Sequence, residues 1–174
     1  MARIPYADCS SEAVRPLAER IVAERGSILH LYQMLLHSTP IAEGWLTYLT
    51  AIRQQSSLPG ALRELIIMRV ALVNKAPYEA QQHAPIALQE GVSQAQLDAL
   101  QDWEPSDAFT AEQRAVLAYT DAMTRQVQVP DDIFAAVSAR YEPAQLVEIT
   151  ATVAAYNMVS RFLEALQIHS HDVR

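Results

Sequence analysis

The chain has 174 residues, of which 51% are hydrophobic, and a formal net charge of −7 at pH 7. This length is enough to bury a sizeable core as one domain. The acidic balance, without any cluster of Lys or Arg, offers a nucleic acid no basic surface. The most apolar run, LIIMRVALV at residues 65–73, contains Arg69 and is too short to span a membrane. We therefore expect a cytoplasmic protein without nucleic-acid or membrane partners.

Prolines divide the chain into segments, and most of them fall where a helix would begin. Four glycines and many Ala, Leu, Gln and Glu residues favour helices, and no segment alternates with the period of a strand. The sequence therefore predicts an all-α, single-domain helical bundle. The expected helices cover residues 11–25, 27–38, 40–55, 59–74, 77–91, 93–100 and 110–126, a segment that begins at Pro130, and residues 143–168, with a loop at 101–109.

Segments 59–71 and 143–155 resemble each other. Both begin with Pro and share a Leu three positions later, a Glu five positions later and an Ala twelve positions later. Such a repeat predicts two related helical hairpins packed around one core.

The helix expected at 59–74 is apolar on almost every side, which is typical of a buried central helix. It nevertheless contains Arg63, Glu64 and Arg69, and none of these has a polar face to itself. A buried charge costs several kcal/mol unless it is paired or hydrogen-bonded. These groups should therefore either pair with one another, which would only fix helix packing, or line a cavity.

The stretch YEAQQHAP at residues 78–85 places Glu79 and His83 one helical turn apart on the same face. Together they can reach one reacting atom. Two structural alternatives remain: the helix dipole stabilises a carboxylate in the first turn after Pro77, and a core histidine can be satisfied by a backbone carbonyl.

Other reactive side chains predict no site. Cys9 is the one cysteine in the sequence and so cannot form a disulfide within the chain. His169 and His171 lie in a polar tail without a third or fourth ligand nearby, so we expect no metal site.

Three stretches in order, LRELIIMRVA, YEAQQHA and GVSQAQLDAL, resemble the carboxymuconolactone decarboxylase family, whose superfamily also holds the AhpD-type alkylhydroperoxidases. The later stretch VEITATVAAYNMVSRF resembles its closing helix. The resemblance implies a helical extension at residues 1–39, a family domain at 40–174, and assembly as a homo-oligomer, either a trimer or a hexamer.

In the peroxidase branch of the superfamily, a glutamate is followed by a CxxC motif and then a histidine. Glu64 and His83 match the glutamate and the histidine, but Ala76 and Glu79 stand at the two cysteine positions. Reduction of a peroxide by this route needs a thiolate and a second, resolving thiol. What remains, Tyr78 with Glu79 and His83, resembles the decarboxylase branch.

The resemblance implies a lyase that needs no cofactor and removes CO2 from a small unsaturated lactone or organic acid. In this hypothesis His83 is the general acid or base, Glu79 is its partner, and Glu64 is a second carboxylate. Either Arg63 or Arg69 would hold the carboxylate of the substrate. The alternatives are an AhpD-like hydroperoxide reductase, which the missing cysteines disfavour, and a non-catalytic helical oligomer that binds a small molecule.

Overall fold

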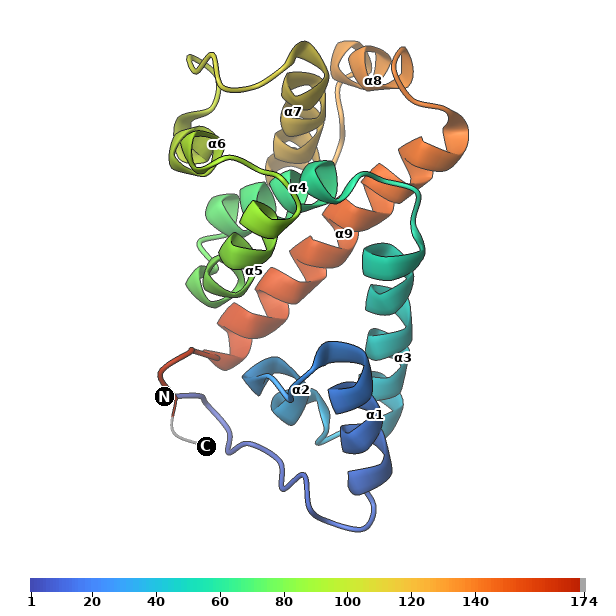
Figure 1. Cartoon of the computed structure of the whole chain (residues 1–174), viewed down its shortest axis with the longest axis vertical. Helices are drawn as coiled ribbons and strands as arrows, with labels where there is room; N and C mark the ends of the chain where they lie inside the picture. The colour runs from blue at the N-terminus through green and yellow to red at the C-terminus, as the bar shows by residue number, and fades with distance from the viewer. Residues whose placement is uncertain (173–174) are drawn as a thin grey trace. The chain divides into compact units, whose positions relative to one another are not determined.

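The computed structural model describes residues 1–172, which form helices joined by short connections and contain no strand (Figure 1). This arrangement confirms the all-α prediction. The chain divides into two compact units, Met1–Gln55 with Leu163–Arg174, and Ser56–Phe162. The domain boundary predicted at residues 39 and 40 stays a prediction. None of the helices in residues 1–172 is long and apolar enough to cross a membrane.

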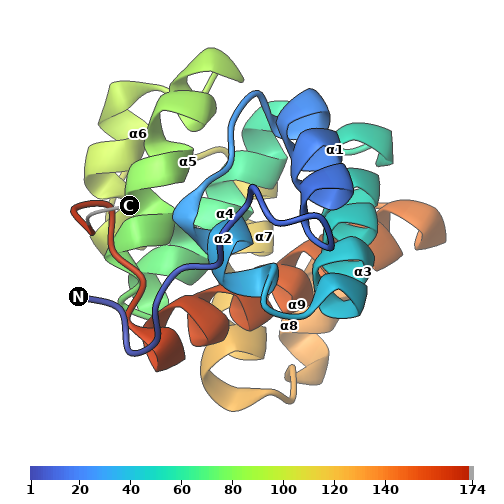
Figure 2. The same ribbon diagram turned by 90° about the horizontal axis from the view of Figure 1, so that it is seen from below.

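The first unit contains α1 (Arg15–Arg25), α2 (His30–Leu35), α3 (Thr39–Thr50) and a π-helical turn at Ala51–Gln55. Helices α1 and α3 lie side by side (Figure 2). Arg25 donates to Thr50 Oγ1 at 2.6 Å, and the Thr50 hydroxyl donates to Glu24 Oε2 at 2.8 Å. Hydrogen bonds from Arg20 and then Thr50 lower the pKa of Glu24, which keeps this carboxylate charged between the two helices.

Helix boundaries in this unit differ from the predictions. The helix expected at 11–25 begins at Arg15, and the one expected at 27–38 shrinks to His30–Leu35. The helix expected at 40–55 is α-helical only to Thr50 and ends in the π-helical turn. Periodicity in the sequence does not distinguish an α-helix from the wider turn that follows it.

The second unit contains α4 (Gly60–Val73), α5 (Pro77–Gln89), α6 (Gln94–Ala99), a 3-10 turn at Leu100–Asp102, α7 (Ala111–Gln126) and α8 (Asp131–Ser138). Most of α9 (Pro143–Leu166) also belongs to it. Helix α4 packs against both α5 and α7, and every residue from Leu62 to Ala71 is buried. The sequence was thus right that this helix is central.

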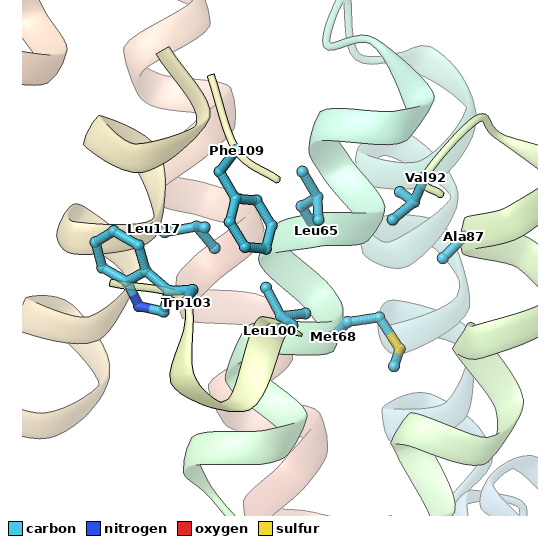
Figure 3. Packing of buried hydrophobic residues seen from close by; sticks show 8 residues of the cluster. All are labelled: Leu65, Met68, Ala87, Val92, Leu100, Trp103, Phe109 and Leu117. Carbon is cyan, nitrogen blue, oxygen red and sulfur yellow. The ribbon is translucent and has the colours of Figure 1, made fainter. Parts of the chain in front are cut away.

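A hydrophobic cluster packs between α4 and its neighbouring segments (Figure 3). Leu65 and Met68 project from α4 toward side chains of the neighbouring segments. These partners are Ala87, Val92, Leu100, Trp103, Phe109 and Leu117. The cluster joins α4, α5, α7 and the connection between α6 and α7 into one core, so the charged residues of α4 are held at fixed positions.

Local signals set several helix ends in this unit. Ser93 and Thr110 each form a capping box, with Gln96 and Gln113 respectively. Gly91, with φ 100°, follows the end of α5. The predicted cap at Ser93 is confirmed, whereas the C-cap of α5 is Glu90, one residue before the predicted Gly91.

Replacing Thr110 tests how much a cap stabilises α7. In Thr110→Ala, the backbone N–H of Gln113 loses its 3.2 Å acceptor. We expect the free energy of unfolding, measured by urea denaturation, to fall by about 1 kcal/mol. Thr110→Ser keeps the acceptor and should stay close to wild type; equal loss in both variants would contradict this account of the cap.

Candidate active site

The α4–α5 hairpin brings Glu64 and His83 together. Nδ1 of His83 lies 2.7 Å from Oε2 of Glu64, and the Glu64 side chain is fully buried. Because a carboxylate oxygen accepts hydrogen bonds, we assign Nδ1 of His83 as the donor in this pair. The arrangement fixes the tautomer of His83 and directs its Nε2 away from Glu64.

Arg63 balances the charge of the same carboxylate. Its Nε lies 3.4 Å from Oε1 of Glu64, and its Nη2 lies 3.3 Å from Oε1 of Glu90, which is 41% exposed. Glu90 approaches the backbone of α4 closely at Gly60, where an added Cβ would overlap its carboxylate. One guanidinium is therefore shared by a buried and a half-exposed carboxylate.

Glu79 occupies the first turn of α5 and is almost completely buried. Its Oε2 accepts a hydrogen bond of 2.8 Å from Ser160 of α9. Tyr156, one turn before Ser160, presents its ring edge-on to His83, with 5.1 Å between ring centroids and 88° between planes. Helix α9 thus contacts both acid–base candidates of α5.

The site is nearly closed to solvent. The exposed fractions are 0% for Glu64, 2% for Glu79 and 8% for His83. Tyr78 is buried at the start of the same helix. The structure therefore brings Glu64, Glu79, His83, Arg63 and Tyr78 onto one helical hairpin, while their chemical roles stay predictions.

Arg69 lies apart from this group. Its Nε and Nη2 donate to the two carboxylate oxygens of Asp121 on α7, both at 2.6 Å. Its Nη1 donates to the carbonyls of Leu100 and Gln101 at 2.9 and 3.0 Å. Five residues along an α-helix correspond to a rotation of about 140°, so Arg69 faces a different side of α4 from Glu64. Its predicted contact with the carboxylate of the substrate stays a prediction.

Ser160 and Tyr156 were missed in the sequence analysis. Both are fully or almost fully buried and stand one turn apart on α9. Two polar side chains four residues apart on a mostly apolar helix were the available signal. The spacing does not identify the hydrogen-bond partner of Ser160, because Glu79 is 81 residues away in the sequence.

No metal ligand set is present in the described part of the chain, where His, Cys, Asp and Glu side chains form no group of three. The candidate site contains carboxylates, a guanidinium and an imidazole without a thiol. Such groups transfer protons and bind anions.

A protein-family model matches the segment of the chain that carries this geometry. The model of the Carboxymuconolactone decarboxylase family matches residues 40–122, the segment that carries Glu64, Glu79 and His83. The match covers 83 of the 174 residues, and over this segment the chain is similar to that family.

Two bacterial proteins are similar to the chain in sequence. The uncharacterized protein YdfG of Bacillus subtilis is 26% identical over 115 residues, which cover 65% of this chain and 78% of YdfG. The uncharacterized protein YnjA of Escherichia coli is 27% identical over 126 residues, which cover 72% of this chain and 66% of YnjA.

Solved structures share the AhpD-like fold. The AhpD core of a peroxidase-related protein from Ralstonia eutropha has a TM-score of 0.83 at 17% identity, covering 98% of this chain and 93% of that one. A cysteine-to-alanine variant of the debrominase Bmp8, in complex with 2,3,4-tribromopyrrole, has a TM-score of 0.82 at 18% identity, covering 98% and 95%. Likeness at this level of identity concerns the fold.

The Arg69–Asp121 pair provides a prediction on stability. Asp121→Ala leaves a guanidinium that is 4% exposed without its carboxylate. Breaking a buried pair in this way should lower the free energy of unfolding by about 3 kcal/mol. The free energy of unfolding is measured by chemical denaturation, with circular dichroism as the signal.

The matched control is Glu43→Ala, which removes a carboxylate that is 62% exposed from its pair with Arg20. An exposed pair contributes at most about 1 kcal/mol. A loss for Asp121→Ala no larger than that of the control would show that Arg69 is satisfied by the two backbone carbonyls alone.

Proposed function

We propose that the protein is a lyase that needs no cofactor, acting on a small unsaturated lactone or organic acid by proton transfer through His83. The observation that supports it is the buried Glu64–His83 hydrogen bond, with Glu79 one turn before His83 on the same helix. A histidine oriented by a carboxylate is a common general acid or base.

Each group has a role in the proposal. Loss of CO2 leaves a carbanion that is delocalised as an enolate, and the product forms when carbon takes up a proton. His83 gives that proton from Nε2, and Glu64 stabilises the imidazolium that exists before the transfer. Glu79, held by Ser160, is the second carboxylate of the site and shares protons with His83.

Arg63 is the group proposed to hold the carboxylate of the substrate. Its guanidinium already contacts the half-exposed Glu90 carboxylate at 3.3 Å. An incoming carboxylate can replace Glu90 there, because a side chain that is 41% exposed moves at little cost. Tyr78 lies beside Glu79 in the sequence and forms part of the proposed substrate wall.

Hydroperoxide reduction is not proposed. Ala76 and Glu79 stand where that chemistry needs two thiols, and Cys9 is the sole cysteine in the sequence.

A non-catalytic role is the second candidate, and the burial of the site favours it. With Glu64, Glu79 and His83 at most 8% exposed, a substrate reaches them only after α5 or its neighbours move. In this alternative the three groups fix the packing of α4, α5 and α9, and the protein binds a small molecule without turning it over. We propose assembly as a trimer or hexamer with either function. Sedimentation velocity measures this oligomeric state.

Turnover by a His83 variant separates the two candidates. Wild type is screened against a panel of unsaturated lactone acids by CO2 release. His83→Gln keeps an amide donor toward Glu64 but cannot transfer a proton, so we expect its turnover to fall by about 100-fold. Circular dichroism confirms that the variant is folded.

His37→Gln is the matched control, because His37 is exposed and contacts the Pro5 carbonyl rather than a carboxylate. It should keep wild-type turnover. Release of CO2 by His83→Gln at the wild-type rate would remove His83 from the mechanism, and no release by wild type from any acid in the panel would contradict the lyase proposal.

A further inference from the structure

Lys75 is the only lysine among the 174 residues; every other basic side chain of the Lys and Arg set is an arginine. It stands in the short connection between α4 and α5 and is exposed. Its φ of 56° lies in the left-handed region that favours glycine.

A hollow of about 380 Å³ lies beside Lys75, at the end of α4 and the start of α5. Its size falls in the range of small-molecule pockets, roughly 300–1,000 Å³. Small apolar side chains of both helices make most of its lining: Ala71, Leu72, Ala76, Pro77 and Ala80.

The remaining lining residues are Lys75 and Gln101. Lys75 is thus the one charged residue in this lining, and the amide of Gln101 supplies further hydrogen-bond donors. The contrast is the hollow beside Arg69, where Asp102, Glu104 and Asp121 add carboxylates to the wall. On a chain with a net charge of −7, the Lys75 hollow combines an apolar wall with a cation and no acid.

We propose that this hollow binds a small apolar carboxylic acid. The hydrocarbon part of the ligand lies against the alanine and proline side chains, and its carboxylate accepts hydrogen bonds from the Lys75 ammonium and the Gln101 amide. Two acceptor oxygens match two separate donors, and the apolar wall selects acids with a ring or branched chain over polar ones.

The site is distinct from the proposed acid–base group and does not depend on it. Ala76, Pro77 and Ala80 line the hollow, whereas Glu79 and His83 belong to the buried residues of α5. Binding at Lys75 is therefore measurable whether or not His83 transfers a proton.

The test uses the full chain and two probes of equal shape, benzoate and its neutral counterpart benzamide, at low ionic strength. Because the chain has one lysine, isotope-labelled lysine gives one side-chain NMR signal, which reports directly on the hollow. We expect benzoate to move this signal and the methyl signals of Ala76 and Ala80. Benzamide should bind about fivefold more weakly, as expected for loss of one exposed ion pair.

Three variants at one position sharpen the test. Lys75→Gln should lower the affinity for benzoate about fivefold, to the level of benzamide, and Lys75→Arg should keep most of it. Lys75→Gly removes the cation and relieves the left-handed conformation, so it should lose affinity while its melting temperature rises. The control is Arg125→Gln, which removes an exposed cation from the other hollow and should leave benzoate binding unchanged.

Each opposite result overturns the proposal. Equal affinity of wild type for benzoate and benzamide would show that the cation takes no part. Wild-type affinity in Lys75→Gln would show the same, and benzoate shifts that omit the Ala76 and Ala80 methyl signals would place binding elsewhere.

Discussion

The burial of one carboxylate, that of Glu64, constrains the rest of the second unit. A fully buried charge in a central helix costs several kcal/mol unless oppositely charged groups and hydrogen bonds surround it. Arg63 supplies the charge, and the imidazole of His83 supplies a hydrogen bond of 2.7 Å. Since His83 belongs to α5, a shift of α5 by one residue along α4 would leave Glu64 without its partner, so the pair fixes the register of the hairpin.

The same constraint explains why structural and chemical roles coincide in this hairpin. Arg63 and His83, which contact Glu64, are also the groups that hold the substrate and transfer the proton in the proposed reaction. Glu79 is also buried, and its Oε2 accepts a hydrogen bond from the hydroxyl of Ser160.

The sequence predicted what is encoded locally. Prolines and caps located most helices, and the apolar surface of residues 59–74 identified the central helix, because these features depend on neighbours within a few positions. The side-chain partners of the charged residues were harder to predict from the sequence. Either arginine of α4 was compatible with Glu64, and the choice was decided by Asp121, which is 52 residues from Arg69 on another helix. Ser160 was missed for the same reason, since no spacing rule connects α9 to α5.

Ala76 and Glu79 stand at the two cysteine positions of the motif, and each affects the hairpin in a different way. Ala76 is buried and small, so it needs no polar partner, and it contributes to the hollow beside Lys75. Glu79 introduces a second buried carboxylate beside His83 on the helical surface and therefore requires a donor, which α9 provides. Ala76 thus contributes apolar surface to the hollow, and Glu79 adds a carboxylate. Neither side chain supplies the thiol that sulfur chemistry needs.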